Sequence, residues 1–395
     1  MKGMPVTEHS GCPVSRARKP EIQGYRAVRR AAKNYREYSS DVQGDADVRT
    51  YRQLPLEADP PRHTQLRGSL MPLFAAEAIE VRLPEFRALA LRLMKKVNEA
   101  GSADLVADFA LPYVMGCLGI VYNRPQDVQE WITWGPNVWL AEIYQRGEEV
   151  SEETKRAQRE RDYSIKTQRS ATVLDAYLER VLAEAHDASG DDRPTDVWQF
   201  LTDARPGGLP MTHDELLGTG NVLLAGGRDT VIKLISGFLW HLISSPTDRR
   251  YLRDHPYERP AAIAEMARYL SPLPKMERLD TRASAGAGEE HRVLLSFVSA
   301  NFDASHYPDP ERLDLRRQDT SSLAFGLGRH SCLGLQITTF ETLALLDALL
   351  TEWPDWVFIG DPGIIWAEED VGDARVRVVD HIEYLRVRTG ALEAG

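Results

Sequence analysis

The sequence predicts a mainly α-helical fold with minor β structure, and three observations lead to this prediction. First, segments such as "ALALRLMKKVNEA" and "VLDAYLERVLAEAH" carry apolar residues at helical spacing with charged residues between them. Second, strand-like segments rich in valine, isoleucine and aromatic residues are few and come late: "RVLLSFVSA", "WVFIG", "ARVRVVD" and "EYLRVRT". Third, strands and helices do not alternate regularly, so a parallel sheet wound by helices is not expected.

The longest helical segment runs from "THDELLG" to "HLISS". Thr212 and Glu215 have capping-box spacing at its start, and Pro246 lies just past its end. We expect one helix that crosses the molecule. Gly226 and Gly227 fall in its middle, where each glycine costs about 1 kcal/mol relative to alanine. The glycine pair therefore predicts a local distortion or a closely packed ligand.

Length and composition narrow the class of protein. The chain has 395 residues, 43% of them hydrophobic, and a formal net charge of -11 without a long basic block, so generic nucleic-acid binding is not expected. The sequence has no run of about 18 apolar residues, so no membrane span is expected. Its N-terminus lacks the apolar centre of a signal peptide. Three cysteines are too few for a disulfide framework, which favours a cytoplasmic protein.

The stretch "FGLGRHSCLG" places Cys332 among glycines at the entrance to an apolar helical segment. Glycine allows a tight turn and a close approach to a flat partner. Backbone N–H groups from the turn and the helix N-terminus would stabilise a thiolate at Cys332. A soft metal bound through one thiolate suits this site. Zinc fits poorly because only His330 lies nearby, whereas haem iron needs a single axial ligand.

A buried structural role is the alternative for Cys332, and it would be favoured for an isolated cysteine. The surrounding glycines and histidine favour a ligand instead. Cys117, in the apolar run "YVMGCLGIVY", is expected to be a core residue.

The stretch around Cys332 resembles the cysteine-loop signature of the cytochrome P450 superfamily of haem-thiolate monooxygenases. The resemblance implies that Cys332 is the axial ligand of haem b (iron protoporphyrin IX). Other family motifs follow in order from about Tyr25 to the C-terminus. We therefore expect residues 25–395 to form one triangular P450-type domain with a long central helix over the haem, and residues 1–24 to form an N-terminal tail.

The segment "AGGRDTV" resembles the oxygen-activating part of the family's central helix. The resemblance implies an oxygen groove at Gly226 or Gly227 and a catalytic acid–alcohol pair formed by Asp229 and Thr230. The alternative for Thr230 is an ordinary helical threonine whose hydroxyl bonds an upstream carbonyl.

Several further motifs resemble the family's haem-binding segments. "DPPRHTQLR" implies contacts between the haem propionates and two of its basic residues, and an arginine after "SPLPKME" matches another propionate ligand. The expected cofactor-binding residues, besides Cys332 and the glycine pair, are His63, Arg67, Arg278, Phe325, Gly326, His330 and Gly334.

The segment "EMAR" has the family's E-x-x-R spacing. Glu265 and Arg268 lie three residues apart on one helical face, and the resemblance implies a buried structural pair that Arg312 would join. The segment with Asp59 comes earlier than is usual, which predicts a reduced N-terminal β region. The aromatic residues of "EWITWGPNVWLAEIY" are expected either in the core or in the roof of a substrate pocket.

The resemblance implies a monooxygenase that inserts one atom of O2 into a small organic substrate by hydroxylation, demethylation or epoxidation. Electrons would come from a separate ferredoxin and ferredoxin reductase, with Arg62 and Arg329 as the expected docking residues. The alternatives are a peroxide-dependent or non-oxygenase haem-thiolate enzyme, a non-catalytic haem protein that binds a ligand, and a hydrolase with Cys332 as nucleophile.

Overall fold

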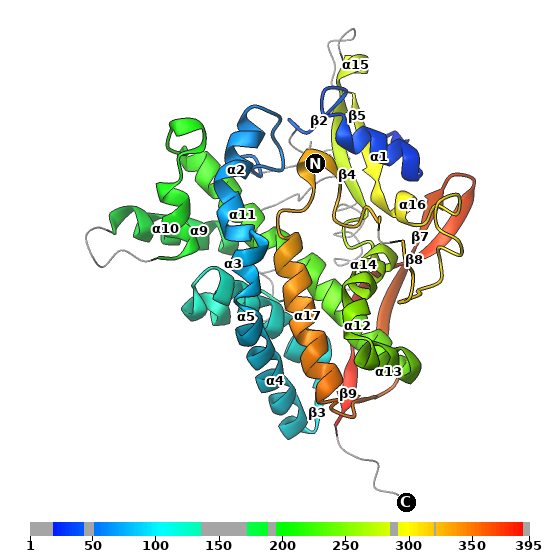
Figure 1. The fold of residues 1–395 in the computed structure, drawn as a ribbon. Coiled ribbons are helices and arrows are strands. Elements are labelled where there is room, and N and C mark those ends of the chain that lie inside the picture. The colour runs from blue at the N-terminus through cyan, green and yellow to red at the C-terminus, as the bar shows by residue number, and fades with distance from the viewer. Residues whose placement is uncertain are drawn as a thin grey trace, which may run out of the picture.

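The structure is a computed structural model that describes residues 19–42, 51–135, 172–188, 195–284, 291–319 and 321–389. It is mainly helical, with three small sheets and a triangular outline (Figure 1), so the predicted fold class is confirmed. The helices are α1 (Tyr25–Lys33), α2 (Arg62–Phe74), α3 (Ala76–Glu80), α4 (Leu83–Ala100), α5 (Leu111–Val121), α6 (Val128–Thr133), α9 (Thr172–Asp187), α10 (Val197–Asp203), α11 (His213–Gly226), α12 (Asp229–Ser244), α13 (Pro246–Asp254), α14 (Arg259–Leu270), α15 (Thr281–Ser284), α16 (Phe297–Asn301) and α17 (Leu335–Thr351).

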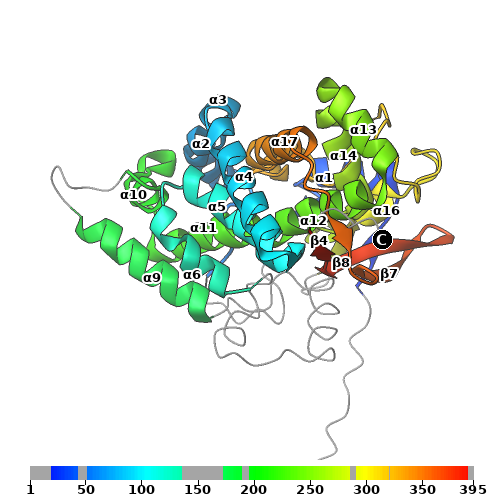
Figure 2. The same cartoon turned by 90° about the horizontal axis from the view of Figure 1, so that it is seen from below.

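The strands are β1 (Glu21–Ile22), β2 (Tyr38–Ser39), β3 (Ser102–Asp104), β4 (Lys275–Asp280), β5 (Arg292–Ser296), β6 (Val357–Phe358), β7 (Gly363–Val371), β8 (Ala374–Tyr384) and β9 (Arg386–Arg388). Most strands have two to six residues, whereas β7 and β8 have 9 and 11. One sheet has the order β1-β5-β4-β2, a second has the order β3-β9-β6, and β7 and β8 form a hairpin. In the turned view this hairpin lies at the opposite end of the molecule from α9 and α10 (Figure 2).

The main core lies between the helices. α17 packs along α4 and also contacts α14, while α12 contacts α5 and α14. One large cluster of buried apolar side chains joins these helices, and a smaller one joins α1 to β4 and β5. A helix such as α17, apolar on nearly every side, is stable because it is surrounded by other helices.

The long central helix is broken. α11 begins with the predicted capping box, in which Thr212 and Glu215 bond each other's backbone N–H groups, and it ends at Gly226. α12 begins at Asp229, and Gly227 and Arg228 between the two helices depart from helical geometry. The predicted distortion is therefore confirmed, and it divides the long central segment into the two helices α11 and α12.

Two further expectations need correction. The segment "RVLLSFVSA" is not one strand, because β5 ends at Ser296 and α16 follows. The Ser296 hydroxyl accepts a hydrogen bond from the N–H of Ser299, which caps the new helix. The folded chain also begins before Tyr25, since Glu21–Ile22 pairs in parallel with β5. Each of β1 and β2 has only two residues, in line with the expected reduction of the N-terminal β region.

The E-x-x-R pair is buried at the end of α14. Arg268 donates two hydrogen bonds to Glu265, at 2.7 and 2.9 Å, and both side chains are 1% exposed. Arg268 also donates to the carbonyls of Asn301 and Arg312. The third side chain in the cluster is Arg317, 3.1 Å from Glu265. The expectation for Arg312 is wrong in this respect, because its side chain is exposed and only its carbonyl joins the network.

Because the charges of this network are almost fully desolvated, removal of Glu265 leaves two guanidinium groups without their carboxylate, and removal of Arg268 leaves the Glu265 carboxylate with Arg317 alone. We expect Glu265→Ala or Arg268→Ala to lower the free energy of unfolding by about 3–5 kcal/mol. Urea unfolding measures this loss. Lys95→Ala, which breaks the exposed Lys95–Glu99 pair of α4, is the control, and its expected cost is below about 1 kcal/mol. Equal losses in the buried and exposed variants would contradict the prediction.

Candidate haem-thiolate site

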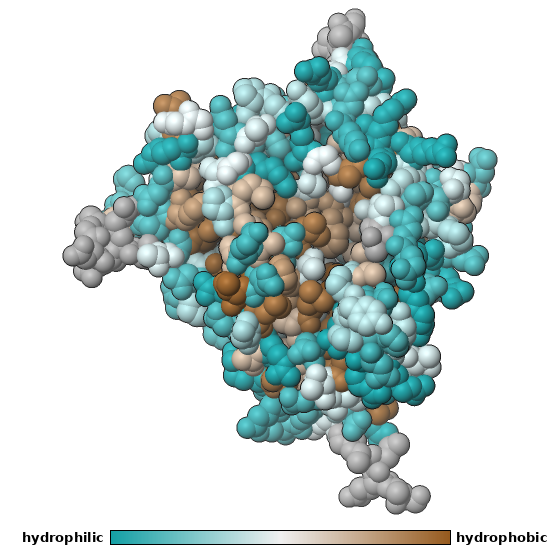
Figure 3. Space-filling model, viewed as in Figure 1, coloured by the Kyte–Doolittle hydropathy of each residue, from teal (hydrophilic) through white to brown (hydrophobic). Residues whose placement is uncertain are grey.

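A cavity of about 470 Å3 lies between the cysteine loop, the break in the central helix, β4 and the start of α2. Apolar residues gather around the hollowed middle of the face seen in Figure 3. All twelve residues expected to bind the cofactor or take part in catalysis line this one cavity: His63, Arg67, Gly226, Gly227, Asp229, Thr230, Arg278, Phe325, Gly326, His330, Cys332 and Gly334. The structural pair Glu265 and Arg268 lies outside the wall.

The cysteine loop closes on itself through a backbone hydrogen bond of 2.7 Å from the N–H of Cys332 to the carbonyl of Phe325. Gly326 and Gly328 have φ angles of 66° and 76°, which favour glycine. A Cβ atom at Gly328 would lie 3.0 Å from the carbonyl oxygen of Ala32 in α1. The two glycines are therefore required by the turn and by its close packing.

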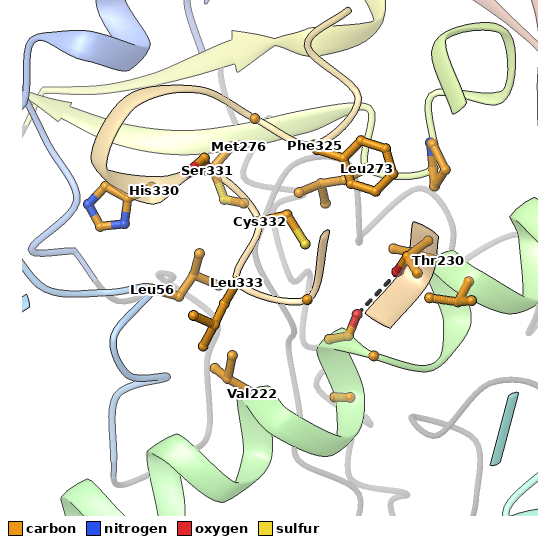
Figure 4. Close-up of a pocket in the computed structure, with 18 of the residues that line it drawn as sticks. Leu56, Val222, Thr230, Leu273, Met276, Phe325, His330, Ser331, Cys332 and Leu333 are labelled. Atoms are coloured by element: carbon orange, nitrogen blue, oxygen red, sulfur yellow. Dashed lines mark hydrogen bonds between the residues drawn. The ribbon is translucent and has the colours of Figure 1, made fainter. Parts of the chain in front are cut away.

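The Cys332 side chain is exposed only to the cavity, since the surrounding protein encloses it. Burial raises the pKa of its thiol, while the N–H of Gly334 and the charge of Arg67 act in the opposite direction. Its sulfur points into the cavity, and the helix break with Thr230 forms the wall beyond it (Figure 4). The Thr230 hydroxyl donates to the carbonyl of Gly226 at 3.2 Å, which is the interaction that the alternative interpretation of this residue predicted.

The cavity also carries basic groups: Arg278 is buried, and the half-buried Arg67 lies beside the cysteine loop, 3.5 Å from the Ser331 hydroxyl. Arg278 on β4 donates to the carbonyl of Glu277 at 2.6 Å, and burial lowers its pKa to about 10 although Asp59 opposes the shift. Burial also lowers the pKa of Arg67. A buried positive charge is costly without a counter-charge. This part of the wall is therefore suited to an anion.

His63 and His330 lie beside these arginines, with ring centroids 4.3 Å apart. The pKa of His63 is lowered mainly by burial and, to a smaller extent, by the charges of Arg67 and Arg329. Asp59 and the Arg329 carbonyl oppose this shift. Within the described chain neither ring nitrogen of His63 makes a hydrogen bond of regular geometry. A buried imidazole in this state is suited to a partner in the cavity.

These features fit a porphyrin. The wall offers one thiol for the metal, two arginines and the His63 imidazole for two carboxylates, and glycines where the backbone must lie close. No group of three or more histidine, cysteine or acidic side chains that could hold a metal ion occurs in the described segments, so the residues do not fit a multidentate site such as zinc.

The structure also places several residues that the sequence did not single out correctly. Arg62 binds Glu215 through two contacts of 2.6 Å, so it is not available for docking as expected. Trp131 and Trp134 are core residues against Tyr177, outside the cavity wall, whereas the remaining aromatic positions, Trp139 and Tyr144, fall outside the described residues.

Glu341 is a cavity residue that the sequence analysis missed. It lies on α17 with its side chain fully buried, and burial raises its pKa to about 8. Its carboxyl group contacts the thiol of Cys117, and its carbonyl accepts a hydrogen bond of 2.7 Å from Tyr113. The available signal was an acidic residue in a helix whose other residues include a single further charged side chain.

Solved structures share the whole architecture. A structure described as that of a carbohydrate active P450 superposes with a TM-score of 0.76 over 94% of this chain and 92% of its own, at 24% identity. A structure of a mutant of P450 EryK in complex with erythromycin B superposes with a TM-score of 0.73 over 95% of this chain and 92% of its own, at 22% identity. The fold is thus that of the haem-thiolate P450 proteins.

Sequence comparisons identify the family. No protein-family profile matches the chain. However, Nocardicin C N-oxygenase from Nocardia uniformis is 30% identical over 310 residues, which cover 76% of this chain and 71% of that protein. Steroid C26-monooxygenase from Mycobacterium tuberculosis is 27% identical over 317 residues, covering 78% and 80%. The chain belongs to the cytochrome P450 family of haem-thiolate monooxygenases. No helix in the described ranges is long and apolar enough to cross a membrane.

The raised pKa of Glu341 has a consequence for stability. Its carboxyl group is protonated in the folded protein up to about pH 8 but only up to about pH 4.5 when exposed. Unfolding therefore releases a proton between these values, and this group's contribution to stability falls as pH rises, by about 1.4 kcal/mol per pH unit. Glutamine cannot ionise, so we expect Glu341→Gln to remove this fall in stability with pH. The free energy of unfolding of the variant, relative to that of the wild type, should therefore rise from pH 5 to pH 8.

Denaturant unfolding of both proteins across this pH range measures the difference. Glu352→Gln, at the exposed end of the same helix, controls for the loss of one carboxylate. Parallel pH profiles for wild type and Glu341→Gln would contradict the assignment.

Proposed function

We propose that this chain inserts one atom of O2 into a small, largely apolar organic molecule and reduces the other atom to water. The reaction consumes one substrate molecule, one O2, two electrons and two protons, and it yields hydroxylated substrate and one water. The observation that carries the proposal is the meeting of Cys332, the Asp229–Thr230 pair and the two arginines on one cavity wall. Val222, shown in Figure 4, is one of many apolar side chains there, which favours an apolar substrate.

The proposed cofactor is haem b, held without covalent attachment. Cys332 would be the axial ligand, and His63, Arg67, Arg278 and His330 would bind the propionates. Covalent haem attachment uses a C-x-x-C-H motif, and the three cysteines of the chain are not spaced in this way. When bound, a thiolate-ligated haem supplies the iron at which O2 is reduced and favours cleavage of the O–O bond.

The chain's own contribution to the chemistry is the control of protons and water. The Thr230 Oγ1 is fixed at the wall by its bond to Gly226 and lies next to Asp229 in the sequence. With its proton donated to Gly226, the hydroxyl oxygen can accept a hydrogen bond from a water in the cavity. The carboxylate of Asp229, 30% exposed, can pass protons toward that hydroxyl through water.

The proposed electron donor is an acidic ferredoxin with its reductase. Arg329 is exposed in the cysteine loop, and α1, which packs on this loop, adds Arg30 and Lys33 without an acidic residue in its first turn. Attraction between such a surface and an acidic partner raises the association rate and is weakened by salt. The salt dependence of the reduction rate, compared between wild type and Arg329→Glu, checks this proposal; a flat response in both would refute it.

The experiment that tests the proposed ligand is the substitution Cys332→Ala. Because Cys332 is the only cysteine among the described residues that line the cavity, we expect this variant to lose the red-shifted carbonmonoxy absorption of thiolate-ligated haem. Absorption spectra of the reduced protein with carbon monoxide, together with haem content, measure the effect. Cys117→Ala, which removes the buried thiol near Glu341, is the matched control and should keep the band. A full band in Cys332→Ala would exclude this ligand.

The role of Thr230 is tested by the fate of the electrons. Without its hydroxyl, protons are delivered with less control, and O2 leaves as hydrogen peroxide after taking up two electrons and two protons. We expect Thr230→Ala to keep consuming reduced nicotinamide while the ratio of product to peroxide falls about tenfold or more. Thr339→Ala, on α17 and outside the cavity wall, is the control. An unchanged ratio in Thr230→Ala would remove Thr230 from the mechanism.

A further inference from the structure

Arg228 occupies the break in the central helix, directly before the proposed catalytic acid. The residue is 2% exposed, although it carries a long charged side chain. Its neighbours Gly227, Asp229 and Thr230 line the cavity, but Arg228 does not. A buried arginine at this place therefore has a structural or chemical partner on the side away from the cavity.

Those partners lie at the end of α6. The Arg228 guanidinium donates to the carbonyl of Trp131 at 2.9 Å and to the carbonyl of Gly135. It also lies over the ring of Trp134, 5.8 Å from the centroid. Carbonyls at a helix C-terminus lack donors within their own helix, so an arginine supplies what they need. The guanidinium thus ties the helix break to a second element.

A further contact leads to the active site. The Nε atom of Arg228 is 3.3 Å from Oδ1 of Asp229, an ion-pair contact without the geometry of a hydrogen bond, and the Asp229 side chain is 30% exposed. The backbone carbonyls fix the guanidinium, which places a positive charge beside one oxygen of the carboxylate. Loss of this charge would remove an attraction that favours the observed orientation of the Asp229 carboxylate.

We propose that Arg228 is a positioning residue that holds the Asp229 carboxylate in place for proton transfer and anchors this orientation to the end of α6. The inference rests on the proposed role of Asp229. Lysine cannot replace arginine fully here, because an ammonium group is one point charge, whereas the guanidinium reaches two carbonyls and a carboxylate at once.

The test compares Arg228→Met, Arg228→Lys, Asp229→Asn and the double variant Arg228→Met/Asp229→Asn. The measurements are haem content, the dissociation constant of a substrate from the spin-state change, the turnover rate, the ratio of product to peroxide and the solvent isotope effect. We expect Arg228→Met to turn over about 10- to 100-fold more slowly with an unchanged dissociation constant and a larger solvent isotope effect. Arg228→Lys should lie between Arg228→Met and wild type.

The double variant separates positioning from a structural role. If Arg228 acts through Asp229, the double variant is no slower than Asp229→Asn, because the carboxylate that Arg228 holds is already lost. Arg249→Met is the matched control, since Arg249 also stacks on a tryptophan, Trp353, and donates to a carbonyl but is remote from the cavity wall. It should have wild-type turnover.

Two results would overturn the inference, and they are distinguishable. Additive losses in the double variant would exclude the role of Arg228 alone. The same conclusion follows if Asp229→Asn is slow while the folded Arg228 variants keep wild-type turnover and a wild-type isotope effect. Wild-type turnover in Asp229→Asn removes the proposed role of Asp229 and the inference with it. If Arg228→Met does not fold, Arg228→Lys decides by the same readouts.

Discussion

The buried pair of Glu265 and Arg268 is the interaction on which the geometry of the cavity depends. Arg268 bonds the carbonyl of Asn301, and the side chain of Asn301 accepts a hydrogen bond of 2.8 Å from the N–H of Leu323. The carbonyl of Leu323 then accepts from Gly326, inside the cysteine loop. A charge pair remote from the cavity wall thus positions the loop through successive hydrogen bonds, and each bond is strong because water is excluded.

The other wall of the cavity is held in a different way. The break between α11 and α12 exposes a helix terminus inside the protein, which is costly unless its polar groups find partners. Thr230 returns a hydrogen bond to Gly226 across the break, and Arg228 links it to α6. A rigid network below the cavity and a tethered break above it together keep the thiol of Cys332 facing the polar residues of the central helix.

Helical periodicity and the glycine pair were sufficient to predict the fold class and the break, because both depend on residues that are close in sequence. Only the resemblance to the P450 family predicted which of the separate motifs meet at one cavity, because no local pattern indicates how distant segments pack together. The failures concern partners distant in sequence. Arg317 rather than Arg312 reaches Glu265, and Arg62 pairs with Glu215, since nothing local indicates which cation a folded loop turns inward.

The charge distribution gives the cavity a further property. The chain carries a net charge of -11, yet its cavity wall concentrates Arg67 and Arg278, both with pKa values lowered by burial. The neighbouring Glu341 is kept neutral up to about pH 8 by the same burial and so gives no counter-charge at neutral pH. Asp59 compensates the charge of Arg278 only in part, because burial still lowers the pKa of this arginine, and an incompletely compensated buried cation destabilises a fold. A ligand with two carboxylates would remove the remaining cost, and its binding would then stabilise the folded protein by linkage.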